Sequence, residues 1–143
     1  MRLKQINAFI KWPNDIYVNN QKIAGILVET IYENTLQGII IGTGLNISKG
    51  SYYSLSDVID HSIDKEKLML NIIDTFKNML HMPFASLLDG MNRHSYLQGK
   101  KIPYKEYGLV KFLYLDENCH LVIEDENKKK HTILLNELSL GRI

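Results

Sequence analysis

Lys11-Trp-Pro-Asn-Asp15 is followed seven residues later by Lys22-Ile-Ala-Gly25-Ile-Leu-Val-Glu29, and these two segments decide how the chain is organised. They place two lysines, an Asn-Asp pair and a glycine between apolar runs. Pro13 predicts the end of a strand that includes residues 8–10, because proline lacks the amide hydrogen that a strand ladder needs. The polar residues 19–21 predict a turn, so we expect a hairpin that joins residues 16–18 to residues 23–31.

A third segment, Gly42-Thr-Gly44-Leu-Asn46-Ile47, ends the next predicted strand, which covers residues 37–45. Residues 38–42 are apolar without alternation, which is typical of a strand covered on both faces. The glycines at 42 and 44 leave room for a ligand to approach the backbone closely. These three segments therefore hold most of the functional information in the sequence.

Two helices are expected next. Residues 48–63 predict a loop with one short helical turn, and Asp64 is a suitable cap for a helix that begins after it. One apolar stripe predicts an amphipathic helix lying against the sheet; its members are Met69, Ile72, Ile73, Phe76, Met79 and Leu80. Pro83 ends this helix, and residues 84–97 predict a second one.

The pattern changes at residue 98. Residues 100–106, 109–115, 121–126 and 131–135 are four short β-prone runs with turn residues between them. Runs at a spacing of about ten residues are typical of a small barrel or sandwich. The sequence thus predicts an α+β fold with one domain over residues 1–97 and a small β domain over residues 98–143.

The composition limits the classes of function. With 45% hydrophobic and 23% charged residues the chain can form a core, and its net charge of +1 gives no argument for nucleic acid binding. The single cysteine, Cys119, suits a reducing compartment. No apolar run has the length of about 20 residues that a membrane span needs. We therefore expect a cytoplasmic protein that binds neither nucleic acid nor membrane.

The polar residues of the three segments suit chemistry on an anion. Two lysines brought together by a hairpin, Lys11 and Lys22, can stabilise negative charge on a phosphate or a carboxylate. Asn14 and Asn46 can orient such a group or a metal-bound water, and Asp15 can contact Mg²⁺ or fix a lysine. The set is consistent with phosphoanhydride or acyl-adenylate chemistry. The alternative is an ordinary hairpin with solvated lysines and turn asparagines.

The three segments, in this order and at this spacing, resemble the catalytic core of biotin protein ligases. The resemblance implies that residues 1–97 are the C-terminal half of a ligase catalytic domain, with part of a class II synthetase-like mixed β-sheet and packed helices. The four β-prone runs resemble, by pattern, the SH3-like barrel that forms the C-terminal domain of these ligases. The five histidines show no paired spacing for a metal site, so no metal ligands are assigned.

The resemblance implies a two-step reaction. Biotin and ATP form biotinyl-5′-adenylate and pyrophosphate, and a lysine of a carboxylase carrier domain then attacks the adenylate. Lys22 would be the catalytic residue, in contact with the biotin carboxylate and the α-phosphate. The substrate-binding residues that the resemblance implies are Lys11 and Asn14 at the ATP phosphates, Asn46 near the nucleotide, Asp15 in a metal or lysine-orienting role, and Gly25, Gly42 and Gly44 beside biotin.

One departure from the family qualifies these expectations. Biotin protein ligases carry a Gly-Arg-rich loop, a Ser/Thr-Thr-Asn stretch and a glutamine-bearing strand before the pentapeptide, where this chain has ten residues. We therefore expect a fragment that is inactive alone and whose unpaired strand edges favour a homodimer. Two alternatives stay open: a non-catalytic binding or assembly protein, and a relative of lipoate ligases, although the pentapeptide favours biotin.

Overall fold

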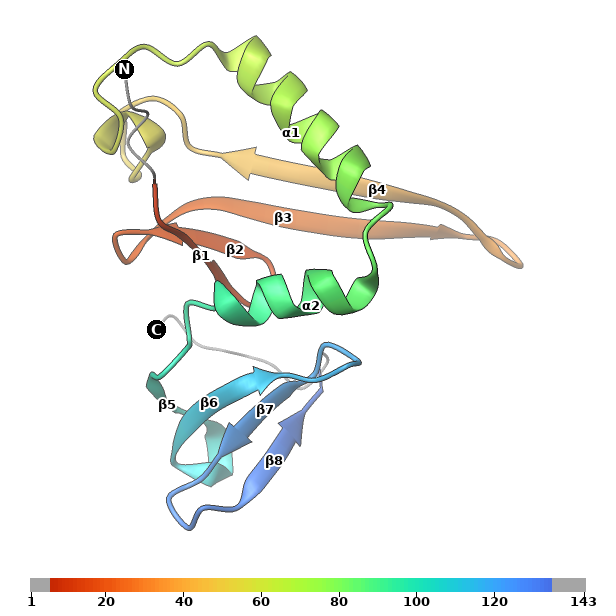
Figure 1. The fold of residues 1–143 in the computed structure, drawn as a ribbon, viewed down its shortest axis with the longest axis vertical. Coiled ribbons are helices and arrows are strands. Elements are labelled where there is room, and N and C mark those ends of the chain that lie inside the picture. Colours follow the sequence, from red (N-terminus) through yellow and green to blue (C-terminus); the bar gives the residue numbers. More distant parts are fainter. Residues whose placement is uncertain (1–5, 135–143) are drawn as a thin grey trace. The chain divides into compact units, whose positions relative to one another are not determined.

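The computed structural model describes residues 6–134, which form two compact units that divide between Asp74 and Thr75. The first unit holds a four-stranded antiparallel sheet with its strands in chain order (Figure 1). Its elements are β1 (Ala8–Lys11), β2 (Asp15–Val18), β3 (Gln21–Tyr32), β4 (Leu36–Leu45), the short helix η1 (Leu55–Asp57) and the first part of α1 (Lys65–Met79).

The second unit holds another four-stranded antiparallel sheet, again in chain order. Its elements are the end of α1, then α2 (Phe84–Arg93), β5 (Lys101–Pro103), η2 (Lys105–Tyr107), β6 (Leu109–Leu115), β7 (Leu121–Glu124) and β8 (Lys130–Ile133). Asn92 connects α2 to β6, because its side chain donates to the Leu115 carbonyl at 3.0 Å and accepts from the Leu115 amide at 2.7 Å.

The predicted hairpin between β2 and β3 is confirmed. Val18 and Gln21 are partners across the strands, so the connection is the two-residue turn Asn19-Asn20. Both turn residues have positive φ values, 50° and 63°. A two-residue turn with positive φ at both positions matches the right-handed twist of the flanking strands, and asparagine tolerates this conformation better than most residues do.

The core of the first unit lies near the start of the long hairpin. Val18, Ile23 and Leu55 are buried there, and Leu55 comes from the predicted helical turn, observed as η1. In contrast, the far half of the hairpin of β3 and β4 extends beyond the ends of β1 and β2 (Figure 1). Its large apolar side chains are 44–67% exposed and include Leu27, Val28, Ile31, Tyr32, Leu36, Ile39, Ile40 and Ile41. We call these eight residues the exposed ribbon.

The exposed ribbon corrects one expectation. An apolar run without alternation predicted a strand covered on both faces, yet neighbours such as Leu27 and Val28, which point to opposite faces, are both exposed. Within residues 6–134 this half of β3 therefore pairs only with β4. The apolar run at residues 38–42 is typical of a buried strand, but no other described residues bury it.

Helix α1 begins as predicted but is less buried than predicted. Asp64 accepts a hydrogen bond from the Lys67 amide at 3.0 Å, as a cap residue does. The apolar stripe from Met69 to Leu80 is 41–66% exposed, so the prediction that it is buried against the sheet is wrong for the described residues. A helical stripe is buried only where another apolar surface covers it.

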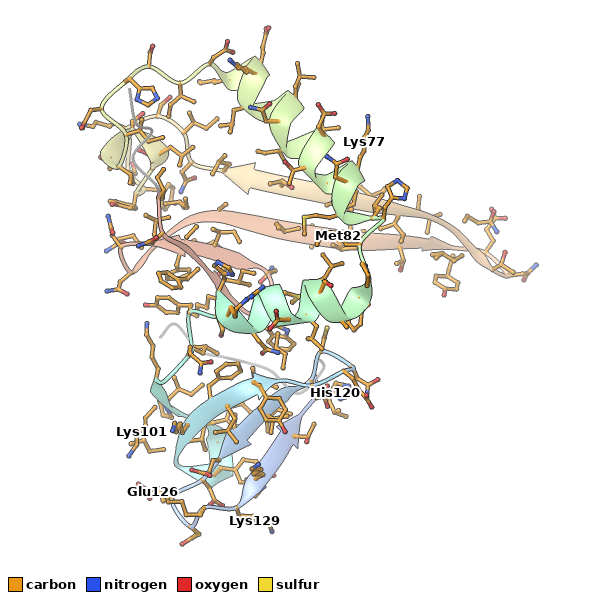
Figure 2. The ribbon with its side chains drawn as sticks, in the orientation of Figure 1. Lys77, Met82, Lys101, His120, Glu126 and Lys129 are labelled. Carbon is orange, nitrogen blue, oxygen red and sulfur yellow. The ribbon has the colours of Figure 1, made fainter. Side chains whose placement is uncertain are left out.

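The connections of the second sheet use one local design twice. Oδ1 of Asp116 accepts from the amides two and four residues later, at 2.9 and 2.8 Å, and Oδ1 of Asp125 does the same at 2.9 Å each. The third residue after each aspartate, Cys119 or Lys128, has a positive φ. Figure 2 shows His120 at one end of this sheet and Glu126 and Lys129 at the other.

The α+β class is confirmed, with differences in detail. A mixed sheet was expected, but all strand pairs of the described residues are antiparallel. The reason is that each strand pairs with the strand that follows it along the chain. Strands β5 to β8 form an open sheet in residues 6–134 rather than the closed barrel that was expected. Pro103 ends β5 early, α2 ends at Arg93 rather than at residue 97, and residue 135 of the last predicted strand lies outside the described residues.

The predicted domain boundary at residues 97–98 stays a prediction. Of the helices in residues 6–134, none has the length and apolar character needed to cross a membrane.

The turn at Asp125 generates a prediction about pH. A hydrogen bond from His131, with Nε2 and Oδ2 separated by 2.8 Å, and amide hydrogen bonds lower the pKa of the Asp125 carboxyl below its ordinary value of 3.8. A depressed pKa in the folded state stabilises that state above the ordinary value, and the stabilisation is lost as the pH falls through the folded pKa. Asp125→Asn keeps an oxygen for the amides, so we expect a weaker loss of thermal stability between about pH 5 and pH 2 than in the wild type.

Glu126→Gln is the matched control, because it removes the same charge at the exposed end of the hairpin. Thermal unfolding followed by circular dichroism across this pH range measures the effect. Equal slopes for Asp125→Asn and the wild type would contradict the prediction.

Candidate functional site

The strand register brings the predicted site residues to one face of the first sheet. Asp15 is the partner of Lys11 on β1 and of Gly25 on β3, and Gly25 is in turn the partner of Gly44 on β4. Residues directly opposite each other on neighbouring strands share a face. A carboxylate, a lysine and two glycines therefore lie in one row across the four strands.

A β-bulge brings Lys22 to the same face. Ala24 is the partner of Ile16, but the partner of Tyr17 is Lys22, so β3 carries one extra residue at this point. Lys22 precedes Gly25 by three positions, and in a regular strand an odd separation places two side chains on opposite faces. The extra residue reverses that alternation and redirects the lysine, a common role of bulges beside functional sites.

The redirected lysine forms an ion pair above a glycine. Lys22 Nζ lies 2.6 Å from Asp15 Oδ1, with the lysine side chain 51% exposed and the aspartate side chain 21% exposed. A Cβ atom at residue 25 would lie 3.4 Å from both of these atoms. Gly25 therefore provides the surface on which the ion pair rests.

A first cavity of about 390 Å³ opens beside this ion pair. Gly25, Gly42 and Gly44 give it a backbone floor, since glycine has no side chain to fill the space. Its other lining residues are Asn14, Asp15, Lys22, Ile26, Leu27 and Thr43. The Asn14 carbonyl accepts from the Ile26 amide at 2.8 Å, which fixes the segment that carries Asn14 and Asp15 to β3.

A second cavity, of about 590 Å³, shares Lys22, Gly25 and Gly44 with the first. Asn46 and Tyr52 line only the second cavity. The Asn46 side chain is oriented by its own loop, because its Nδ2 donates to the Tyr53 carbonyl at 3.1 Å. Lys22 thus stands between two spaces, an arrangement suited to a reaction that joins two molecules.

Tyr52 was not selected from the sequence. It is 76% exposed and lines the second cavity together with Asn46. The available signal was an aromatic residue after Gly50-Ser51, close in sequence to the third glycine-rich segment.

Lys11 differs from the other predicted residues. It is 9% exposed, its Nζ donates to the Tyr17 hydroxyl at 3.4 Å, and the same atom lies 5.2 Å from the centre of the Tyr17 ring. It does not line either cavity described above. Its role at ATP phosphates stays a prediction. Trp12, beside it, is 4% exposed and belongs to the core.

The position of Lys22 makes this a candidate anion site. In the part of the chain that the structure describes, no three His, Cys, Asp or Glu side chains are grouped closely enough to hold a metal ion. Lys22 presents a cation at the junction of the two cavities, above exposed backbone. Such a cation can stabilise a carboxylate or a phosphate, and a preorganised cation stabilises charge that develops during a reaction.

Comparison with known proteins shows what the segment that carries the site is similar to. Residues 2–46 match the Biotin/lipoate A/B protein ligase family, a segment that contains all three motifs up to Asn46. The resemblance to this class that the motifs predicted is confirmed. The curated proteins to which the chain is similar include biotin–protein ligases and bifunctional ligase/repressors.

Two curated relatives illustrate this. Biotin–protein ligase 1, chloroplastic, of Arabidopsis thaliana is 44% identical over 48 residues, which are 34% of this chain and 13% of that protein. The bifunctional ligase/repressor BirA of Bacillus subtilis is 34% identical over 83 residues, which are 50% of this chain and 26% of that protein. The matches therefore span a minor part of each relative.

The fold is that of a solved ligase. Biotin protein ligase from Aquifex aeolicus superimposes with a TM-score of 0.75 at 21% identity, covering 96% of this chain and 66% of that one. A mutant of the same ligase has been solved in complex with biotin, and it superimposes with a TM-score of 0.72 at 22% identity, covering 96% of this chain and 63% of that one. At this level of identity the likeness shows the fold alone.

The position of Gly25 generates a prediction about the ion pair. Valine at residue 25 suits a β-strand, but its methyl groups would occupy the space beneath Lys22 Nζ and Asp15 Oδ1. We expect Gly25→Val to separate these two atoms beyond the 4 Å limit of an ion pair. A crystal structure of the variant, or NMR of its lysine ammonium groups, measures the separation.

Gly50→Val is the control, because no atom lies within 4 Å of a Cβ at that residue. An intact ion pair in Gly25→Val would show that the glycine is not needed for this geometry.

Proposed function

We propose that this chain forms the charge-stabilising part of a biotin protein ligase active site. The observation that carries the proposal is the Lys22 ammonium, held 2.6 Å from Asp15 above Gly25 and shared by two cavities. The substrates would be biotin and ATP, and the acceptor would be a lysine of a carboxylase carrier domain. The lone cysteine is consistent with a cytoplasmic protein.

In the first step, a carboxylate oxygen of biotin attacks the α-phosphorus of ATP, a bond to phosphorus forms, and pyrophosphate leaves. Negative charge increases on the α-phosphate oxygens as the bond forms. In the second step, the acceptor amine attacks the carbonyl carbon of the adenylate and AMP leaves, so negative charge develops on the carbonyl oxygen and on the leaving phosphate. Lys22 would stabilise this charge in both steps, because a fixed cation needs no reorganisation during the reaction.

The resemblance divides the other residues between the two substrates. Gly25, Gly42 and Gly44 would contact biotin through exposed backbone, Asn14 and Lys11 would contact the ATP phosphates, and Asn46 would orient the nucleotide. The first cavity carries Gly42 and Asn14, whereas the second carries Asn46, so both substrates would reach Lys22.

Magnesium is consistent with this site only as an ion that arrives with ATP. Asp15 supplies the one carboxylate that lines the cavities described here, and it is engaged with Lys22. Mg²⁺ is often held by one or two carboxylates together with substrate phosphates. When bound, it would neutralise phosphate charge, and Asp15 and Asn14, which line the first cavity, would supply oxygen donors.

The exposed ribbon supports a further element of the proposal. An apolar surface of this extent on a two-stranded hairpin is typical of a surface that another part of a protein covers. We propose that adenylate formation needs the part of a biotin ligase that this chain does not match, packed on the ribbon. A second copy of the chain on the same surface would give a homodimer instead.

The exposed ribbon also favours a second candidate function, a non-catalytic protein that binds or assembles through this surface. A relative of lipoate ligases is a third reading, since the matching family includes both ligase types. Competition between biotin and lipoate for binding separates the two ligands.

The decisive test is removal of the Lys22 charge. The chain is assayed for biotin-dependent formation of adenylate from ATP, together with a polypeptide that supplies the unmatched part of a bacterial ligase. Lys22→Met keeps much of the side-chain volume but removes the cation, and we expect a loss of about 100-fold or more in the rate.

Lys67→Met is the control, because Lys67 is an exposed residue of α1 that does not line either cavity. Equal rates for Lys22→Met and the control would exclude the catalytic role of Lys22. No adenylate from the wild-type chain with its complement would favour the non-catalytic alternative.

A further inference from the structure

The two residues of the Asp15–Lys22 ion pair differ in which cavities they line. Lys22 lines both of them, whereas Asp15 lines only the first. The Lys22 ammonium is paired with Asp15, with 2.6 Å between Nζ and Oδ1. An anion that reaches Lys22 therefore meets a cation that already has a partner.

We propose that Asp15 is a positioning residue that holds the Lys22 ammonium above Gly25 until a carboxylate or phosphate oxygen of a substrate replaces it. This exchange deepens the proposed function, on which it rests for the identity of the natural anions. It predicts that Asp15 orients Lys22 and at the same time competes with the anion that Lys22 binds.

The surroundings of the pair favour exchange over simultaneous binding. A carboxylate or phosphate bound to Lys22 would come close to the negative charge of Asp15, and like charges at such a distance repel. Lys22 is free to move, because its side chain is 51% exposed and ends in a rotatable ammonium group. Gly25 and Gly44 present no side chain that would block its movement between the two cavities.

The backbone at Asp15 does not depend on its side chain. Asp15 is paired with Lys11 on one side and with Gly25 on the other, and the preceding residue, Asn14, accepts from the Ile26 amide. The strand register is therefore held by neighbouring strands. Asp15→Asn changes the charge and leaves this framework in place, so its effect on anion binding reports on the ion pair.

The experiment uses inorganic pyrophosphate as the probe, at pH 7 and constant ionic strength, with binding followed by NMR of the Lys22 ammonium and the Asp15 carboxylate. In the wild type, saturation with pyrophosphate is expected to move both resonances, because Asp15 is released. In Asp15→Asn the competitor is absent, and we expect the dissociation constant to fall about 3- to 10-fold. A purely structural role for Asp15 predicts weaker binding instead.

Three variants sharpen the result. Asp15→Glu restores the charge and is expected to bind pyrophosphate within about twofold of the wild type. Asp60→Asn removes an equivalent charge at an exposed residue that does not line either cavity, and no change is expected. In a Lys22→Met background, Asp15→Asn is expected to lose its strengthening effect, because the two residues act as a pair.

A second probe separates the sources of the anion. Biotin is compared with its uncharged methyl ester, and Asp15→Asn is expected to increase the preference for the carboxylate by a similar factor. Pyrophosphate binding that Asp15→Asn weakens or leaves unchanged would overturn the proposal, as would an Asp15 resonance that stays fixed at saturation. The absence of pyrophosphate binding in both proteins would overturn it as well.

These outcomes are independent of catalysis. If Asp15→Asn binds pyrophosphate more tightly but no adenylate forms, the exchange of Asp15 for an anion on Lys22 is supported and the ligase function is rejected. Adenylate formation with unchanged anion binding in Asp15→Asn would do the reverse.

Discussion

The irregular pairing between β2 and β3 is the constraint on which the site depends. One extra residue on β3 allows Lys22 to share a face with Asp15 and Gly25. Without it, period-two alternation would direct the lysine to the opposite face, where Val18 and Ile23 form the core. A charged ammonium in that core would be costly. A single bulge therefore determines which face of the sheet carries the ion pair and which face carries the core at Val18 and Ile23.

Glycine residues provide the open surface beside the ion pair that the bulge positions. A lysine and an aspartate side by side on a sheet would ordinarily neutralise each other and contribute little. Here they rest on glycines, so the surface beneath them is backbone that a ligand can contact. The same glycines leave β4 without side chains along part of one face. The glycines therefore shape the space above the sheet without interrupting the pairing of β3 with β4.

The sequence predicted local structure well, but it predicted poorly which apolar side chains are buried by distant parts of the chain. The Asn19-Asn20 turn, the Asp64 cap and the run of β6 follow from residue chemistry within a few positions. The Lys22–Asp15 contact could have been predicted, since both residues belong to one predicted hairpin. The β-bulge could not have been predicted, because no turn residue or glycine marks its position in the sequence. The burial of Lys11 against Tyr17 and the exposure of Ile39 depend on neighbours that no local pattern encodes.

The repeated aspartate turns of the second sheet have a consequence for how this unit forms. Each turn supplies its own hydrogen bonds within five residues, and every strand pairs with the next one along the chain. Contacts between near neighbours cost little loop-closure entropy, so they form early and fast. We therefore expect β6, β7 and β8 to acquire their register as a local event soon after they leave the ribosome. The first sheet also pairs each strand with the next one along the chain, but the apolar side chains of its long hairpin stay exposed in the described residues.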